Sequence, residues 1–407
     1  HAAASAPPAP ARPAAAALPA PAAPAPPADA PPPLARTTYQ NRFGDAKLRA
    51  LEEFGGSAET ERAVAAGLAY LARIQDESGF WGERADFDPE KYGDVRIGKT
   101  GLALLAFLGA GHTPGGASQH AARVRRAVAF LAGEQHENGH FGDGSAYDHG
   151  IAAFALAECF AMTRDPALAE PVARATAWIL AQQQAGDNPR FAGGWGYYFA
   201  DEHVWNDDRW PRVSVTAWQV MALASARLGG LEVPANSLTA AGLFLAQAWD
   251  PRRGAFRYSH DPDRLRSGYP ILPASTPAAL FALSVLGLDA AAPELAPARA
   301  FVLDRAPRGY QSRGEDAFVR EAAGNLYFWY YGTLALFRAG GNAWRRWNLA
   351  LQETLLPAQA PDGSWPPICV YARYAGDDEQ ERTYTTAMCV LSLEVYYRYF
   401  TPLLKVR

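Results

Sequence analysis

Two kinds of apolar segment alternate along the chain from residue 38 onward. The first kind, such as ERAVAAGLAYLARIQ, carries Arg or Glu along one side, which predicts an amphipathic helix with one solvent-exposed face. The second kind, such as TGLALLAFLGAG or TPAALFALSVLG, is apolar nearly all round and predicts a buried helix. Because half-exposed and buried helices alternate, we expect two concentric helical layers in an all-α fold.

The buried segments begin in the same way six times. Each starts at a polar or aromatic residue that is followed, six positions later, by a small residue. The leading residues are Thr100, His149, Thr216, Thr276, Trp329 and Thr386. Six copies of a helical hairpin predict an (α/α)6 toroid, since closing the ring removes the exposed ends of an open solenoid.

A turn containing Gln, Gly and an aromatic residue precedes most of these buried segments. The copies are Gln75, Gly79 and Trp81; Gln135, Gly139 and Phe141; Gln184, Gly194 and Trp195; Gln247, Gly254 and Phe256; and Gln359, Gly363 and Trp365. The fifth copy, FVLDRAPRGYQ, lacks both the Gln and the Trp. We expect a structural role, in which the carboxamide satisfies helix-end groups and the indole packs on a neighbour.

The repeated QxxxGxW turn resembles the QW repeats of the squalene-hopene cyclase and protein prenyltransferase superfamily, which includes the terpenoid cyclase-like toroids. The resemblance covers residues 45–400. It implies an (α/α)6 toroid in which the second helix of each pair lines the inside and the QW turns tie neighbouring hairpins together.

The catalytic signatures that the resemblance implies are missing. Class II terpene cyclases protonate an alkene with a DxDD motif just before an inner-helix Thr, whereas here Thr216 and Thr100 follow RVSV and RIGK. The prenyltransferase zinc site needs Asp, Cys and His at inner-helix starts, but Cys389 and Cys159 lie three and ten residues beyond the leading residues. We therefore expect no metal and no cofactor, and Asp148 and His149 are the weak catalytic candidates.

The starts of the buried helices should meet at one mouth of the ring, where helix dipoles favour anions. The predicted ligand-binding residues there are Arg96, Lys99, Tyr147, Asp148, His149, Arg212, Trp329, Tyr330, Arg382 and Tyr384, beside Ser214, Ser275 and Tyr327. This mixture suits a small hydrophobic or glycan ligand. A polar rim closed by its own salt bridges and hydrogen bonds is the simpler interpretation of the same residues.

The longest insertion, residues 197–213, carries several acidic groups among aromatic residues. They are Asp201, Glu202, His203, Asp207 and Asp208. A solvated loop is the simpler interpretation, and an acidic site of a carbohydrate enzyme is the alternative.

Residues 1–37 form an Ala/Pro-rich tail before a single predicted domain over 38–407. Twelve prolines remove amide donors and fix φ, so we expect an extended tail or linker that docks on a neighbouring subunit and supports self-association. The start of the chain at His1, followed at once by this run, favours an extracytoplasmic location.

Charge and hydropathy exclude some partners. The net charge of −4, from 38 basic and 42 acidic residues, shows no excess of positive charge of the kind that binds nucleic acid. No run approaches eighteen apolar residues, so no membrane span is expected.

Three functions fit the sequence. The favoured one is an exported, non-catalytic toroid that acts as a structural or binding module. Its Pro-rich tail would dock on a neighbouring subunit, as in a polymer or filament, or tether the domain. The second is a divergent isoprenoid cyclase or prenyltransferase-like enzyme, which requires a dry aromatic cavity with an acid inside. The third is a carbohydrate-active enzyme or glycan-binding toroid, which requires an open groove and, for hydrolysis, two carboxylates.

Overall fold

The computed structural model of the chain describes residues 39–82, 95–142, 145–186, 188–197, 210–262 and 271–398. The predicted tail over residues 1–37 lies outside these ranges. So do the acidic residues predicted at Asp201, Glu202, His203, Asp207 and Asp208.

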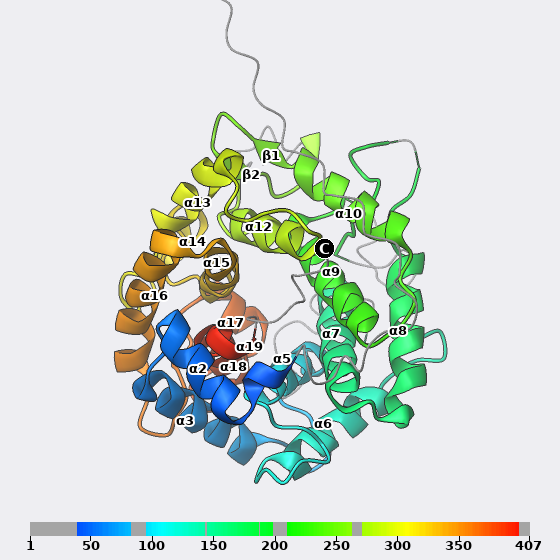
Figure 1. The fold of residues 1–407 in the computed structure, drawn as a ribbon, viewed down its shortest axis with the longest axis vertical. Coiled ribbons are helices and arrows are strands. Elements are labelled where there is room, and N and C mark those ends of the chain that lie inside the picture. Colours follow the sequence, from blue (N-terminus) through cyan, green and yellow to red (C-terminus); the bar gives the residue numbers. More distant parts are fainter. Residues whose placement is uncertain are drawn as a thin grey trace, which may run out of the picture.

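The described helices form two concentric rings, which confirms the predicted all-α toroid (Figure 1). The outer helices are α3 (Ala58–Ile74), α6 (Ala121–Gly133), α8 (Ala169–Ala181), α10 (Ala235–Gln247), α13 (Ala296–Leu303) and α16 (Gly341–Leu355). The inner helices are α5 (Arg96–Gly109), α7 (Ala146–Thr163), α9 (Val213–Leu228), α12 (Ser275–Val285), α15 (Leu326–Ala339) and α18 (Thr383–Leu393). Each inner helix packs against the next, and α18 returns to α5, so the ring closes.

Shorter elements complete the wall and one end of the ring. Those in the wall are α14 (Gly314–Glu321), α17 (Val370–Tyr374), η2 (Pro166–Leu168), η3 (Pro293–Leu295) and η4 (Leu356–Ala358). Near the chain ends lie η1 (Gln40–Arg42), α2 (Gly44–Phe54) and α19 (Val395–Arg398), which contact one another. The strands β1 (Trp249–Asp250) and β2 (Ala255–Phe256) pair antiparallel, with Trp249 opposite Phe256.

Small residues allow the inner helices to approach closely. In α5, a Cβ atom at Gly101 would lie 2.8 Å from Cγ2 of Ile151 in α7. Ala103 and Ala106 of the same helix are fully buried. The apolar character on all sides of these segments therefore follows from packing on both the outer helices and the inner neighbours.

The first QW turn ties three helices together. The Gln75 side-chain amide donates to the carbonyl of Gly79 at 2.9 Å and to that of Arg123, in α6, at 3.0 Å. The Trp81 indole N–H donates to the carbonyl of Leu71 in α3 at 2.8 Å. The Trp81 backbone N–H donates to Oγ1 of Thr100 in α5 at 3.0 Å. The turn therefore bonds to its own hairpin and to the next outer helix.

The last QW turn uses the same bonds to close the ring. The Gln359 side-chain amide donates to Gly363 and to Ala63 in α3, both at 2.9 Å, so the sixth hairpin is bonded to the first. Gly363 has φ +91°, and a Cβ atom there would lie 2.2 Å from the carbonyl oxygen of Ala66. Both its backbone conformation and the close approach of α3 require glycine.

In the third turn, the structural Gln and Gly each lie one residue before the positions predicted from the sequence. The side chain that bonds to Gly193 at 3.0 Å and to Ser237 at 2.9 Å belongs to Gln183, whereas Gln184 takes part through its backbone. The positive φ, +90°, is likewise at Gly193 and not at the predicted Gly194. Three consecutive glutamines and a longer loop made the spacing ambiguous in the sequence.

The fourth turn departs further from the pattern. Gln247 is exposed, and within the described part of the chain its side chain makes none of the bonds that the other glutamines make. The β1–β2 hairpin takes its place, and Phe256 retains the inner contact by donating its N–H to Oγ1 of Thr276 at 3.0 Å. The predicted structural role therefore does not hold for Gln247.

A buried ionic cluster lies where the inner helices end. Arg42 pairs with Glu158 at 2.8 Å, and Arg398 approaches the same carboxylate at 3.5 Å, with all three side chains fully buried. Arg42 also donates to the carbonyl of Leu108 at 3.1 Å, near the end of α5. Cations at this position complement the negative ends of the inner helices.

No helix in the described ranges is both long and apolar enough to cross a membrane.

Candidate functional site

A central cavity of about 410 Å³ lies at the end of the ring where the inner helices begin. Tyrosines dominate its wall: Tyr147, Tyr197, Tyr258, Tyr327, Tyr371, Tyr374 and Tyr384. The larger apolar residues that line it are Trp218, Leu102, Ile151, Leu272 and Met388. Its volume and largely apolar, aromatic lining are typical of small-molecule sites.

Helical periodicity decides which residues face this cavity. In α9, Thr216 faces the QW turn, because its Oγ1 accepts the Trp195 backbone N–H. Two residues before and after Thr216, Ser214 and Trp218 line the cavity. Positions two apart differ by about 200° around an α-helix, so they lie on the opposite side from the leading residue. In α18 the same two positions, Tyr384 and Met388, also line the cavity.

The cavity brings together part of the predicted set. Lys99, Tyr147, Asp148 and Tyr384 line it, as do Ser214, Ser275 and Tyr327. The remaining predicted residues, Arg96, His149, Arg212, Trp329, Tyr330 and Arg382, are not among the lining residues.

Four of these six residues pack against aromatic rings instead of lining the cavity. The Arg96 guanidinium lies 5.0 Å from the centre of the Phe80 ring. The Arg212 guanidinium is buried against Tyr197 and Tyr258, whose ring centres are 5.4 and 5.2 Å away. The Trp329 ring lies 6.1 Å from that of Tyr310, and Tyr330 stacks on Trp218 at 5.9 Å. Of these four, Arg212 and Tyr330 therefore contact aromatic residues of the cavity wall from behind.

Arg382 is held by polar contacts. Its guanidinium donates to Oγ of Ser364 at 3.1 Å, and its backbone N–H donates to the Tyr70 hydroxyl at 3.1 Å.

His149 takes the structural position that threonine occupies in four other copies. Its Nδ1 accepts the Phe141 backbone N–H at 3.2 Å, and its Nε2 lies 3.2 Å from the carbonyl of Ala175 in α8. Burial, with a smaller contribution from His140, lowers the pKa of His149 to about 3. His149 is therefore a neutral imidazole directed at the wall, which corrects its prediction as a catalytic and cavity-mouth residue.

Asp148 supplies the only carboxyl group among the described residues that line the cavity. It lies in the first turn of α7, where its backbone N–H donates to the capping Ser145 hydroxyl at 3.4 Å. The carboxyl group lies against α5, because a Cβ atom at Gly98 would be 2.3 Å from its Oδ1. The absence of a side chain at Gly98 makes room for this acid.

Hydroxyl groups of the wall are linked in pairs. The Tyr147 hydroxyl donates to Oγ of Ser214 at 2.7 Å, and the Trp218 indole N–H donates to the Tyr327 hydroxyl at 3.0 Å. Burial raises the pKa of Tyr147 and Tyr327 well above the ordinary tyrosine value. These phenols are therefore neutral at physiological pH and present uncharged ring faces to the cavity.

Lys99 is the only cationic residue among the described residues of the lining. Its ammonium group lies 3.0 Å from Oδ1 of Asp377 and also contacts Glu381. Burial lowers the pKa of Lys99, but the two carboxylates raise it by more, so the net shift is upward. The cluster is an ion triad at the edge of the cavity.

The cysteines provide no reactive or metal-binding centre in the described structure. Cys159, Cys369 and Cys389 are all buried free thiols. Burial raises the pKa of Cys159 to about 12 and that of Cys369 to about 11, so neither is a thiolate at neutral pH. Among the described residues, no three His, Cys, Asp or Glu side chains are arranged to hold a metal ion.

Several wall residues escaped the sequence analysis. Trp218 could have been found from the helical register, since it lies two residues after Thr216. Tyr371 and Tyr374 belong to α17, and no repeated signal marks them. Tyr197 and Tyr258 each lie two residues after the aromatic residue of a QW turn, Trp195 and Phe256, and this shared spacing could have identified them.

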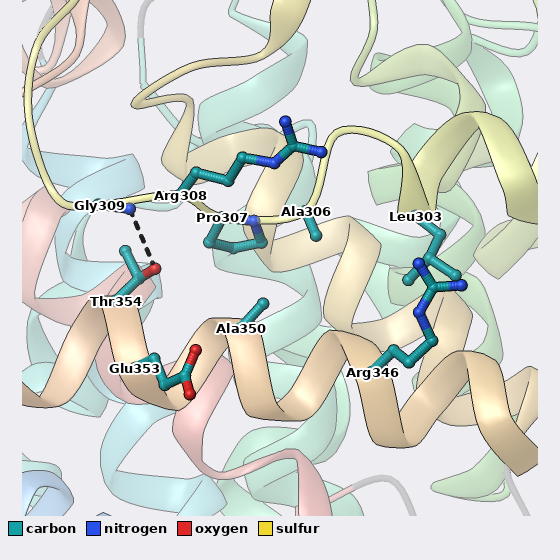
Figure 2. Close-up of a pocket in the computed structure, with 9 residues that line it drawn as sticks. All are labelled: Leu303, Ala306, Pro307, Arg308, Gly309, Arg346, Ala350, Glu353 and Thr354. Atoms are coloured by element: carbon teal, nitrogen blue, oxygen red, sulfur yellow. Dashed lines mark hydrogen bonds between the residues drawn. The ribbon is translucent and has the colours of Figure 1, made fainter.

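A second hollow of about 500 Å³ lies outside the ring, between the fifth turn and α16 (Figure 2). Gly309 donates its N–H to Oγ1 of Thr354 at 3.4 Å there. Figure 2 shows the charged side chains of Arg308, Arg346 and Glu353 spread along this hollow without meeting at one point. The central cavity is therefore the candidate site.

The fold is shared with solved enzymes at low sequence identity. No protein-family model matches the chain, and comparison with curated proteins gave no match. A variant of the type II terpene cyclase MstE from Scytonema, in complex with its substrate geranylgeranyl dihydroxybenzoate, has a TM-score of 0.55 at 16% identity over 83% of this chain and 97% of that one.

Mannanases of the GH76 class have the same kind of fold. The α-mannanase of Bacteroides thetaiotaomicron has a TM-score of 0.61 at 10% identity, covering 86% of this chain and 98% of that one. An inactive variant of the α-1,6-mannanase of Salegentibacter sp., in complex with α-1,6-mannotriose, has a TM-score of 0.56 at 10% identity over 83% and 99%. At these identities the comparisons establish the toroid fold.

Proposed function

We propose that the chain is a divergent isoprenoid cyclase-like enzyme that binds an apolar, unsaturated ligand in its central cavity. Asp148 is the proposed proton donor. The observation that carries this proposal is the position of Asp148, the single described carboxyl group in a lining otherwise made mainly of aromatic and aliphatic side chains. The isoprenoid hypothesis from the sequence required a dry aromatic cavity with an acid inside, and the position of Asp148 in this lining supports it.

The chemistry is general acid catalysis followed by cation stabilisation. The Asp148 carboxyl proton adds to one alkene carbon, the π electrons form the new C–H bond, and a carboxylate and a carbocation result. The faces of neutral tyrosine and tryptophan rings attract a cation through their quadrupoles. The rearranged cation then loses a proton to water, and the Asp148 carboxylate regains a proton from water, so the net reaction is an isomerisation of the ligand.

The carbohydrate alternative has weaker support. Glycoside hydrolysis requires a pair of carboxyl groups on either side of the scissile bond. In the described lining only Asp148 is available, and the acidic residues of the 197–213 insertion all lie outside the described ranges. The likeness to the mannanases concerns the fold.

The sequence favoured a non-catalytic structural or binding module. The experiment described below distinguishes this function from the enzyme. Self-association through residues 1–37 and an extracytoplasmic location stay predictions, because that tail lies outside the described residues.

The test is Asp148→Asn, assayed against a panel of prenyl substrates with mass-spectrometric detection of cyclised products. We expect the wild type to form product and Asp148→Asn to lose at least about a hundredfold in rate while it still binds the substrate. Asp304→Asn, at an exposed position, is the matched control and should keep full activity. Unchanged turnover in Asp148→Asn would remove Asp148 from the chemistry. Binding without turnover in the wild type would favour a binding module.

A further inference from the structure

We infer that the ligand of the central cavity carries no anionic head group, so that its class is an uncharged or cationic isoprenoid and not a prenyl diphosphate. This inference rests on the proposed function, because it assumes that the cavity is the binding site. The ion triad of Lys99, Asp377 and Glu381 carries the argument.

The triad leaves no cation for an anionic ligand within the described lining. Lys99 is the one lining cation, and its side chain is only 2% exposed. Two carboxylates share its single positive charge, one at 3.0 Å and one in direct contact. Burial, together with Asp377, raises the pKa of Glu381, although Lys99 opposes this shift. Lys99 is therefore already paired with two carboxyl groups and has no uncompensated positive charge to offer a ligand.

Hydrogen bonds hold both carboxylates in place. Asp377 accepts the backbone N–H groups of Tyr384 at 3.1 Å and Thr385 at 2.7 Å. Glu381 accepts the backbone N–H of Thr383 at 2.9 Å and also contacts its hydroxyl group. These bonds fix the carboxylates at the start of α18, so Asp377 also occupies the helix N-terminus that would otherwise attract an anion.

Displacement of either carboxylate by a ligand phosphate would be costly. The Asp377 side chain is fully buried, and removing its cation would leave an uncompensated charge inside the protein. A diphosphate bound without displacement would instead face two carboxylates across one lysine, which is a repulsive arrangement. An alcohol or hydrocarbon end meets neither penalty.

The experiment compares three C15 probes that share one chain: the prenyl alcohol, its diphosphate and its amine. Isothermal titration of the full protein should give measurable binding of the alcohol and the amine, and at least about tenfold weaker binding of the diphosphate. Diphosphate binding equal to or tighter than that of the alcohol would overturn the inference while leaving the proposed site intact. If none of the three bound, the proposed function would fail and this inference with it.

Two variants assign the effect to the triad. Glu381→Gln removes one carboxylate from Lys99 and should improve diphosphate binding by about tenfold, with little change for the alcohol. Glu379→Gln makes the same chemical change at a neighbouring exposed position and should alter neither affinity. Equal diphosphate affinities in the two variants would show that the triad does not exclude anions. If Glu381→Gln failed to fold, the comparison of probes on the wild type would still decide the inference.

Discussion

His149 and Phe141 are joined by a 3.2 Å hydrogen bond, in which the imidazole Nδ1 accepts the Phe141 backbone N–H. Threonine hydroxyls accept the equivalent N–H in four other copies, for example Thr100 from Trp81. The second hairpin therefore holds its turn with a group that can gain a proton, and stability should depend on pH there.

We predict that acidification destabilises the protein through His149. Its pKa is about 3 in the folded chain, whereas an unfolded histidine has a pKa of about 6.5. Below pH 6.5 the unfolded chain binds a proton that the folded chain does not, so stability that is fully present above pH 6.5 is lost as the pH falls. Between pH 7 and pH 5 the loss from this residue should be roughly 2 kcal/mol.

Urea unfolding of His149→Thr at the two pH values checks this expectation. Threonine supplies the acceptor found in the other copies, so the variant should lose roughly 2 kcal/mol less than the wild type between pH 7 and pH 5. His136→Gln, at an exposed histidine in the same turn, should follow the wild type. An unchanged pH dependence in His149→Thr would contradict the assigned neutral state of the imidazole.

The same residue shows what the sequence could and could not predict. The alternation of half-exposed and buried segments was sufficient to predict the toroid. A helix buried on one side has apolar residues on one face, whereas a helix buried on all sides has them all round, and both patterns can be seen in the sequence. The leading residues were located correctly along the chain. The directions of their side chains were not predicted correctly. His149 and Trp329 were expected to face the mouth of the ring, but they pack into the wall.

Which residues line the cavity depends partly on contacts between distant segments, and no repeated sequence pattern marks those contacts. Lys99 and Asp148 immediately precede leading residues, so their position was predictable from the helix starts. The partners of Lys99, in contrast, come from a segment 278 to 282 residues later, and only the closure of α18 on α5 brings them together. The same is true of Tyr371, which reaches the cavity on the short helix α17.

Ring closure provides a second prediction. Gln359→Ala removes the donor to the carbonyls of Ala63 and Gly363, and should lower the free energy of unfolding by about 1–3 kcal/mol. Gln247→Ala is the matched control, because Gln247 is exposed and makes no equivalent bonds in the described structure. Its effect should stay within about 0.5 kcal/mol. Chemical denaturation of both variants at pH 7 measures the difference, and similar losses would show that the closing bonds contribute little.

The buried carboxylate of Glu158 provides the third prediction. Burial raises the pKa of Glu158, but Arg42 and Arg398 lower it by more, so the net shift is downward and the group is ionised at neutral pH. Glu158→Gln removes the carboxylate that the two buried guanidinium groups share, leaving only the buried Glu394 near them in the described part of the chain, and should cost about 3–5 kcal/mol at pH 7. Because the folded pKa is depressed, this stabilisation is present above the unfolded pKa of about 4.3 and is lost as the pH falls through the folded value.

Glu59→Gln is the control for Glu158→Gln, because it makes the same chemical change in an exposed ion pair. The difference between the two variants in the free energy of unfolding measures the effect of burial. Glu59 pairs with Arg62 at 3.8 Å on the surface, where both side chains are about 70% exposed, so its loss should cost less than about 1 kcal/mol. Denaturation at pH 7 and at pH 3 should show a large deficit for Glu158→Gln that narrows in acid, and a small deficit for Glu59→Gln at both values. A deficit for Glu158→Gln that equalled the surface control would mean that the cluster does not hold the end of the ring. The narrowing in acid separates the lost charge interaction from a packing defect, because a packing defect would persist at both pH values.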